Sequence, residues 1–436
     1  MIEVKYKYMS KNTTLRYYPR YIEKEIERKL RSSGAIVVAG PKFCGKTTTC
    51  MRYGKSSIQL NTAETIRLAK LQPKSVLSGE KPRLIDEWQT VPDIWNQVKD
   101  DLDKEYTFGK YILTGSSTPA DTTEIYHSGA GRITPIKMKT LTLFESCESS
   151  GLISLTELFR GESFEGFELN QQFSLSDLAF LICRGGWPIA LVKDRNQALD
   201  ITKNYYNSLL LFEYSENETF RNKRPELLKM ILRSYARNIS TEASLQTLID
   251  DTKAVTGGTL DRKTFDEYLD ALKSLYIIED VSAWNPNIRS KTAVRSTPTR
   301  HFTDTSIACR ALNISPDDLL SNLTAFGLFF EDFAVRDLSV YAQTLSGEIR
   351  HYRDNTGLEC DAVIRLEDGR WAAVEIKLGG DELVEEGARS LLRLKAKIAE
   401  KSDEAAPSFL MVLTGTGPLY RREDGIFVVP INCLKA

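Results

Sequence analysis

The most specific chemical pattern in this sequence of 436 residues is a glycine-rich loop near its start. The loop fits G-x-x-x-x-G-K-[ST] in full, and its glycines allow a tight turn whose successive N–H groups converge on a phosphate. Lys46 would reach the β- and γ-phosphates of a nucleotide, and the Thr47 hydroxyl would ligate Mg²⁺. We therefore expect a nucleotide to bind at Gly40, Pro41, Lys42, Phe43, Cys44, Gly45, Lys46, Thr47 and Thr48.

An acidic pair, Asp86 and Glu87, stands at the end of the apolar run at residues 83–86, which suits a buried parallel strand. An acid at the end of such a strand can hold Mg²⁺ through its water, and we assign this role to Asp86. Glu87 comes next and is placed to polarise the attacking water as a general base. The alternative is a solvated pair of acids at a strand end, but the phosphate loop upstream favours the catalytic interpretation.

Two further positions are candidates for contacts with phosphate. A third apolar run, residues 111–114, ends where Thr114, Ser116 or Ser117 could sense a γ-phosphate through a hydrogen bond. Arg132 would reach a phosphate in cis, or that of a neighbouring subunit in trans. A surface arginine without a role in the site is an equal alternative for Arg132.

A second set of polar residues lies near the C-terminus. Glu375 and Lys377 share one face of a strand because side chains alternate along it, and Asp361 falls on the neighbouring strand of a hairpin. Two acids can hold Mg²⁺ or Mn²⁺ while the lysine orients a water, and Glu331 or Asp332 on the preceding helix would add a ligand. The pattern resembles the restriction-endonuclease-like fold. A solvated strand face is the alternative, since Glu-x-Lys alone is common.

The elements that must position these residues change in character along the chain. Apolar runs at 35–39, 83–86 and 111–114, with helical patterns between them, predict a parallel, doubly wound sheet that follows an amphipathic helix at 18–32. Helices then dominate from about 170 to 285, where their order before a strand at 276–281 is that of a winged-helix unit. From about 320, strands and helices mix again in a second α/β domain. We expect domains at 1–165 (P-loop ATPase), 166–300 (helical and winged-helix-like) and 301–436 (restriction-endonuclease-like).

The middle region has two interpretations. In the winged-helix unit, the helix at 262–275 begins with Arg262 and Lys263, which could meet phosphates of DNA. The same helix carries acids that repel a polyanion, so a packing and relay module is at least as well supported. These acids are Asp261, Asp266, Glu267 and Asp270.

Composition places few further limits on function. The net charge of −1 gives no global argument for a polyanionic partner, so any DNA or RNA contact must come from local basic patches. The 7 cysteines form no Cys-x-x-Cys pair, and 3 histidines cannot complete a zinc site of the usual spacing. Scattered cysteines fit a reducing compartment, and neither a signal core nor an apolar membrane span is present. We expect a cytoplasmic protein without membrane association.

The combination of motifs resembles a known family of predicted archaeal and bacterial AAA-type ATPases, relatives of the STAND signalling NTPases, joined to a C-terminal domain of unknown function. The resemblance spans nearly the whole chain, and Cys44 departs from the small or branched residue often found at its position. It implies an ATP-binding core, a winged-helix-like connector and a nuclease-like tail. It is carried by residues 16–17, 40–49, 84–89, 111–116, 128–132, 185–188, 303–304 and 330–338, and by Asp361 and 375–377.

Two hypotheses about the whole chain follow. In the first, ATP turnover gates metal-dependent cleavage of nucleic acid, which requires Asp361, Glu375 and Lys377. In the second, slow hydrolysis drives a molecular switch whose C-terminal domain only binds a partner. The intact polar set favours the first, and a regulator acting through the winged helix is disfavoured by its acidic helix. An oligomer or a protein partner is compatible with either hypothesis.

Overall fold

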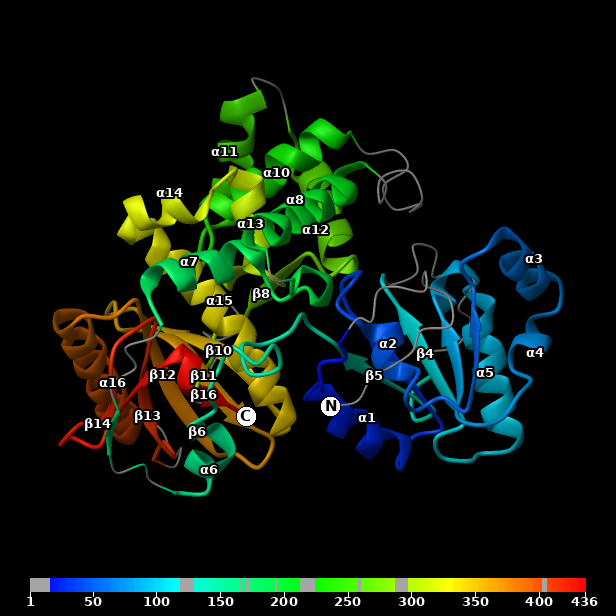
Figure 1. Cartoon of the computed structure of the whole chain (residues 1–436), viewed down its shortest axis with the longest axis horizontal. Helices are drawn as coiled ribbons and strands as arrows, with labels where there is room; N and C mark the ends of the chain where they lie inside the picture. The colour runs from blue at the N-terminus through cyan, green and yellow to red at the C-terminus, as the bar shows by residue number, and fades with distance from the viewer. Residues whose placement is uncertain are drawn as a thin grey trace.

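The computed structural model describes residues 16–117, 129–162, 164, 166–168, 173–192, 194–211, 224–256, 260–286, 297–401 and 406–436. Figure 1 shows an α/β domain in blue and cyan, a group of helices in green, and a second α/β domain in orange and red. The long helix α15 (Leu323–Thr344) contacts both α/β domains, because it packs against α1 (Ile22–Leu30) and against the C-terminal sheet.

The N-terminal domain is built on a five-stranded sheet in which every pairing is parallel. The strand order is β2-β3-β4-β1-β5, so β1 and β4 are central and buried. Parallel sheets need cover on their faces, and apolar strands such as residues 35–39 supply the buried runs. The strands are β1 (Ala35–Ala39), β2 (Ser56–Gln59), β3 (Arg83–Asp86), β4 (Tyr111–Gly115) and β5 (Ile133–Lys137).

Short helices connect these strands and cover the sheet. In α1, Ile22 and Ile26 are buried on one face, as the spacing of four predicts. The expected strands at 35–39, 83–86 and 111–114 are present, whereas β2 and β5 were not expected because Ser, Gln and Pro interrupt their apolar pattern. The helices are α2 (Lys46–Cys50), α3 (Ala63–Leu71), α4 (Pro73–Val76) and α5 (Asp93–Lys104), with a short 3-10 turn at Trp88–Thr90.

The middle of the chain is helical. Within it, α10, α11 and α12 are followed by the antiparallel pair β8 and β9. A large apolar cluster joins these helices to α15 and to one face of the C-terminal sheet. The elements are α7 (Leu175–Arg184), α8 (Arg195–Leu211), α10 (Pro225–Arg237), α11 (Leu245–Thr256), α12 (Arg262–Ser274), β8 (Ile278–Val281), β9 (Thr299–Phe302), α13 (Thr305–Leu312) and α14 (Pro316–Ser321), with a 3-10 turn at Pro188–Ala190.

The C-terminal domain contains a mixed sheet of seven strands in the order β10-β11-β12-β13-β15-β14-β7. The first three strands form an antiparallel meander, and β13 and β15 then continue in parallel with β12. The elements are β10 (Gly347–Arg353), β11 (Glu359–Leu366), β12 (Trp371–Lys377), α16 (Asp381–Lys401), β13 (Leu410–Thr414), β14 (Leu419–Arg421), β15 (Phe427–Pro430) and β16 (Leu434–Lys435), with a 3-10 turn at Ile431–Cys433.

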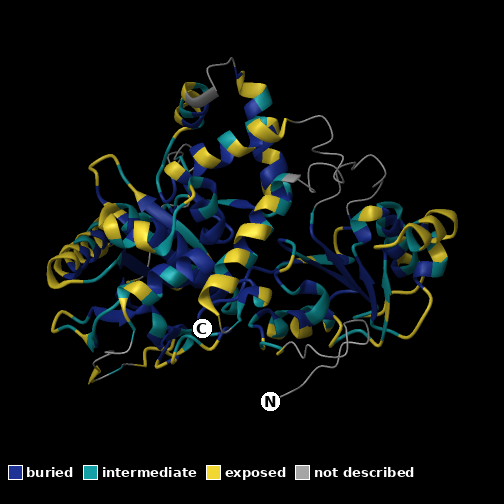
Figure 2. Ribbon diagram, turned by 45° about the horizontal axis from the view of Figure 1, so that its top comes forward, coloured by how far each residue is buried: buried dark blue, intermediate teal, exposed yellow. Residues whose placement is uncertain are grey.

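The two faces of this sheet are covered by different helices. Ala362, Ile364 and Val374 belong to the same apolar cluster as α15, whereas Val363 and Ala373 belong to the cluster that includes α16. This alternation follows from the period of two along each strand. Figure 2 shows buried strands between helices whose outward faces are exposed, most clearly on α16.

Two short strands that follow the N-terminal sheet in the chain pair with strands of the C-terminal domain. Here β6 (Ile153–Ser154) pairs with β16, and β7 (Phe167–Glu168) pairs with β14; α6 (Leu155–Phe159) lies between them in the chain. The short strands at 153–154 and 167–168 therefore pair with strands of the C-terminal domain, whereas the expected boundary at 165 places the first of them in the N-terminal domain. Among the residues described, no helix is both long enough and apolar enough to cross a membrane.

Candidate nucleotide site and a second acidic cluster

The glycine-rich loop joins the end of β1 to the start of α2. Gly45 has a φ of 101°, which suits glycine, and it is the residue that precedes the helix. A Cβ on Gly40 would lie 2.0 Å from the carbonyl oxygen of Met138, so only glycine fits there. The loop thus places its backbone at the carboxyl edge of the parallel sheet, where open α/β folds bind their ligands.

Lys46 and Thr47 are the first two residues of α2. Lys46 is 5% exposed, and its Nζ donates hydrogen bonds to the carbonyl oxygens of Gly40 (2.9 Å) and Pro41 (2.8 Å). Thr47 Oγ1 donates to Asp86 Oδ1 at 2.8 Å. The ammonium is therefore held within the loop, from which it can turn to a bound phosphate.

Asp86 ends β3 and is 4% exposed. Its carboxylate accepts hydrogen bonds from Thr47, Thr114 and the amide of Gln59. Burial raises the pKa of Asp86 above its ordinary value, while the bonds from Thr114 and Thr47 act in the opposite direction. A hydroxyl and a carboxylate in direct contact are oxygen donors of the kind that Mg²⁺ takes, so Thr47 and Asp86 fit the expected ion.

Glu87 is held in place by two polar neighbours. It has a φ of 57°, uncommon for a residue with a side chain, and its Oε2 accepts hydrogen bonds from Ser116 Oγ (3.0 Å) and from Gln89. Gln89 also donates to Ser116 Oγ at 3.3 Å. Ser116 thus orients the carboxylate of Glu87, and all three residues lie at the same edge of the sheet as the loop.

The other residues of the loop face different surroundings. Pro41 and Cys44 are buried, and Lys42 and Thr48 are partly exposed. Phe43 is 61% exposed, with a φ of 62°, and its ring meets the edge of Tyr205 in α8, with centroids 5.9 Å apart. The tip of the loop therefore contacts the helical part of the chain.

Arg132 lies at the opposite end of the sheet. It precedes β5, and its carbonyl oxygen accepts a hydrogen bond from the N–H of Ala35 at the start of β1 (3.0 Å). The loop follows the last of the five residues of β1, and a strand of that length spans about 16 Å. The side chain is 42% exposed and pairs with Asp103 at 2.8 Å. Arg132 is therefore not brought to the loop of its own chain.

The C-terminal polar residues do converge. Lys377 Nζ lies 2.8 Å from Glu375 Oε2 and 3.3 Å from Asp361 Oδ2, which also accepts the N–H of Ile376 at 2.7 Å. Burial lowers the pKa of Lys377, but the two carboxylates outweigh it and raise that pKa overall. Burial and the nearby Asp361 raise the pKa of Glu375 to about 8. The lysine therefore lies between the two acids as their shared counter-ion.

Glu331 reaches the same neighbourhood from α15. Burial, and then the charge of Asp361, raise the pKa of Glu331 well above its usual range. Asp332 points elsewhere, since it accepts hydrogen bonds from Phe302 N (2.9 Å) and Thr305 Oγ1 (2.6 Å). In the parts of the chain that the structure describes, no group of three or more His, Cys, Asp or Glu side chains is arranged to hold a metal ion. The expected metal ligands Glu331, Asp361 and Glu375 thus form no preassembled ligand set.

Sequence reasoning missed several residues of the nucleotide site. Gln59 and Gln89 carry no motif of their own, and their roles follow from the register of β2 and from the turn after β3. Arg20 is also buried against the loop, where its guanidinium donates to the carbonyl oxygen of Cys44. Its local sequence signal was weak, because Arg20 is one of several charged residues in the predicted amphipathic helix at 18–32.

Comparison with protein families agrees with this geometry. Residues 32–147 match the family described as an AAA domain, a range that contains the whole loop, Asp86 and the parallel sheet. The N-terminal domain is an AAA-type P-loop ATPase domain. Residues 175–318 and 326–434 match two further families, described as Domain of unknown function (DUF8612) and Domain of unknown function (DUF4143).

The chain also resembles whole proteins. "Uncharacterized protein Mb2031c" of Mycobacterium bovis and "Uncharacterized protein Rv2008c" of Mycobacterium tuberculosis are each 23% identical over 375 residues, which cover 84% of this chain and 75% of theirs. Among solved structures, the Walker-type ATPase PABY2304 of Pyrococcus abyssi is 15% identical, with a TM-score of 0.41, over 68% of this chain and 96% of that one.

Proposed function

We propose that this chain binds and hydrolyses ATP and uses the cycle to control a C-terminal domain that cleaves or binds nucleic acid. The carrying observation is the nucleotide site, where Lys46, Thr47, Asp86 and Glu87 meet at one edge of a parallel sheet. The AAA domain match at 32–147 supports the ATPase part. The control of the C-terminal domain rests on the contact of α15 with both α/β domains.

Each residue of the site has a proposed role in hydrolysis. The loop N–H groups and Lys46 bind the β- and γ-phosphates, and Thr47 and Asp86 hold Mg²⁺, which neutralises charge on the phosphates when bound. Glu87 accepts a proton from the attacking water, and Ser116 and Gln89 keep its carboxylate oriented. Arg132 is proposed to act only in trans, on the nucleotide of a neighbouring subunit.

For the C-terminal domain we propose a restriction-endonuclease-like fold. Its support is a helix, an antiparallel meander, a second helix and a parallel strand, with Asp361 on β11 and Glu375 and Lys377 on β12. Lys377 is placed to donate to a phosphate of DNA or RNA if it leaves the two carboxylates. The described residues assemble no group of three metal ligands at this site, so the proposed role of Lys377 includes no step through Mg²⁺ or Mn²⁺.

The same cluster favours a second candidate function, the molecular switch. Lys377 pairs with both acids, at 2.8 Å from Glu375 and 3.3 Å from Asp361, so its ammonium is occupied within the cluster. Such a closed cluster can serve as a structural element in a domain that binds a protein partner without cleaving anything. In this hypothesis, hydrolysis in the N-terminal domain only changes the domain arrangement.

The helical region is proposed to be a winged-helix-like connector. Its support is the order of α10, α11 and α12 before the hairpin of β8 and β9. Arg262 pairs with Asp266 on the same helix at 2.8 Å, which lowers its availability for phosphate. A packing and relay role therefore suits this unit better than DNA binding.

The proposal is tested by mixing the purified protein with single- and double-stranded DNA and with RNA, in Mg²⁺ or Mn²⁺, with and without ATP. Lys46→Ala and Lys377→Ala are compared with Lys395→Ala, an exposed lysine on α16. Cleavage that Lys377→Ala abolishes, and that responds to ATP only when Lys46 is intact, is the expected result. ATP hydrolysis without cleavage under any condition would leave the switch, and no ATP binding would overturn both.

A further inference from the structure

Arg20 is a buried arginine in direct contact with the phosphate-binding loop. It lies just before α1, and its side chain is 4% exposed. Its Nη1 donates to the carbonyl oxygen of Cys44 at 2.7 Å, and its Nη2 donates to that of Lys139 at 2.8 Å. A Cβ on Gly45 would lie 3.5 Å from Nη1, so the guanidinium also borders the glycine that precedes α2.

The third edge of the guanidinium faces Glu145. Arg20 Nε lies 3.2 Å from Glu145 Oε1, an ion pair in which Nε makes no hydrogen bond. The carboxylate is fixed by the N–H of Tyr21 (2.7 Å) and that of Thr142 (2.9 Å). A buried charge needs such a partner, so the position of Arg20 is set jointly by the loop and by residues 139–145.

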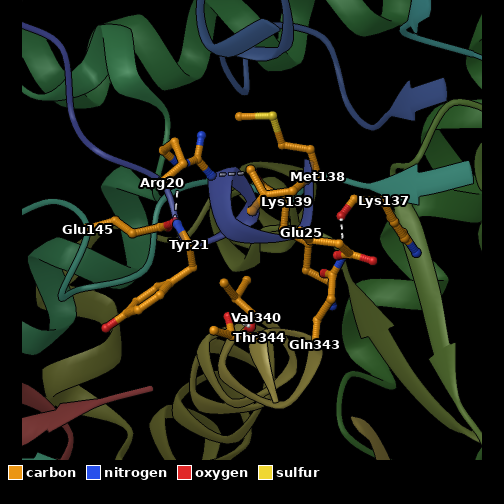
Figure 3. Close-up of a pocket in the computed structure, with 11 residues that line it drawn as sticks. Arg20, Tyr21, Glu25, Lys137, Met138, Lys139, Glu145, Val340, Gln343 and Thr344 are labelled. Carbon is orange, nitrogen blue, oxygen red and sulfur yellow. Dashed lines mark hydrogen bonds and ion pairs between the residues drawn. The ribbon is translucent and has the colours of Figure 1, made fainter. Parts of the chain in front are cut away.

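Residues next to Arg20 in the chain also contact α15. The Tyr21 ring meets the edge of the Tyr341 ring, with centroids 5.5 Å apart, and Gln343 Nε2 donates to Glu25 Oε2 (2.7 Å) and to the carbonyl oxygen of Lys137 (2.9 Å). Figure 3 shows Arg20 and Glu145 above the turn of α15 that carries Gln343, around a small cavity. The path from the loop to α15 therefore runs from Arg20 to Tyr21, whose N–H is bonded to the same carboxylate of Glu145 that pairs with Arg20.

The residue type matters for this arrangement. A guanidinium is planar and offers five N–H donors in a fixed fork, so it can hold two carbonyl oxygens and a carboxylate at once. A lysine ammonium at position 20 would be a point charge on a flexible stem and could not span all three. Because α15 is one continuous helix of 22 residues, a shift at Tyr341 reaches Glu331 about 15 Å away along a rigid element.

We infer that Arg20 is a positioning residue for the nucleotide site, which holds the Cys44 carbonyl of the loop and passes the state of the loop to α15 through Tyr21 and Glu145. The inference rests on the proposed ATPase function and adds the residue that links it to the C-terminal domain. Arg20 donates to a backbone carbonyl oxygen of the loop, so it acts on ATP through the backbone of the loop. Its loss should therefore weaken ATP binding more than it slows the chemical step.

The test uses the full chain and a fluorescent ATP analogue. Arg20→Ala and Arg20→Lys are compared with Arg31→Ala, an exposed arginine at the end of α1. We expect KM for ATP to rise on the order of tenfold in Arg20→Ala, with a smaller change in kcat, because a hydrogen bond from a charged donor is lost. Guanidinium ion at a non-denaturing concentration should restore binding to Arg20→Ala.

Hydrogen exchange of residues 335–344, with and without ATP, provides the second measurement. Wild type should show a nucleotide-dependent change that Arg20→Lys and Glu145→Gln lack, although Glu145→Gln keeps the contact between Arg20 and the loop. Failure of wild type to bind ATP would overturn the proposed function itself. If Arg20→Lys bound ATP as tightly as wild type and showed the same ATP-dependent hydrogen exchange in α15, this inference alone would be overturned. That outcome can be read even if Arg20→Ala does not fold.

Discussion

At the scale of single residues, the nucleotide site separates binding from chemistry. Lys46 and Thr47 belong to a helix whose start is fixed by the loop, whereas Glu87 follows β3 in a left-handed backbone conformation. That conformation places its carboxylate against Ser116 and Gln89. The two groups of residues follow different strands, β1 and β3, so a change in one can leave the other intact.

The first prediction concerns Glu87. In Glu87→Gln, ATP should still bind because the loop and Lys46 are unchanged, but hydrolysis should fall by about a hundredfold or more, as expected for a lost general base. Phosphate release and binding of a fluorescent ATP analogue measure the two effects. Glu80→Gln, an exposed acid shortly before β3, serves as the control. Hydrolysis at the wild-type rate would show that Glu87 is not the base.

At the scale of elements, strand β10 connects the C-terminal sheet to the helical region. The backbone of His351 on this strand makes two hydrogen bonds to the helical region. Its carbonyl oxygen accepts from the N–H of Trp284 at 2.6 Å, and its N–H donates to the carbonyl oxygen of Ser282 at 3.1 Å. Its imidazole is 3% exposed, and Nδ1 lies 3.4 Å from Glu242. Burial, with His301 nearby, lowers the pKa of His351 to about 4.

The second prediction is a pH dependence of stability. Below pH 6.5 the unfolded chain binds a proton at His351 that the folded chain takes up only near pH 4, so stability falls as the pH falls across this window. Between pH 6.5 and 5 the loss should be about 1–2 kcal/mol. Urea unfolding of wild type and His351→Gln at several pH values measures it, and the variant should show the weaker dependence. Equal slopes would contradict the assignment.

At the scale of the whole molecule, a buried polar junction joins the three parts of the chain. Asp304 accepts hydrogen bonds from Thr140 Oγ1 (2.7 Å) and from the N–H of Gly186 (2.9 Å). Arg336 on α15 pairs with both Asp304 and Asp337. Asp337 in turn accepts the N–H of Leu143 at 2.9 Å. One arginine therefore neutralises two carboxylates that hold the connection from the N-terminal domain.

The third prediction is that Arg336→Met strongly destabilises the protein. The substitution leaves two buried carboxylates without their counter-ion, and breaking such a pair costs about 3–5 kcal/mol. Denaturant unfolding measures the loss, and Arg393→Met on the exposed side of α16 is the matched control. A free energy of unfolding within about 0.5 kcal/mol of the control would contradict a central role for this junction.

Local patterns account for the parts of the fold that could be predicted. The runs at 35–39, 83–86 and 111–114 are strands because consecutive apolar residues suit a strand buried on both faces. The hairpin of β11 and β12 follows from alternation and from its turn residues, which also bring Asp361 near Lys377. The strands β2 and β5 were missed because their polar residues interrupt the run of apolar residues expected of a buried strand. Pairing with the neighbouring strands makes these segments strands.

The sequence by itself determined the phosphate loop and its acidic pair, since these depend on residue type and on short spacings. The tertiary structure alone decided that Arg20 borders the loop, that Arg132 lies at the far end of the sheet, and that the strands at 153–154 and 167–168 pair with the C-terminal domain. The physical reason is distance along the chain. Contacts between residues tens to hundreds of positions apart depend on strand order and packing, which no local pattern encodes.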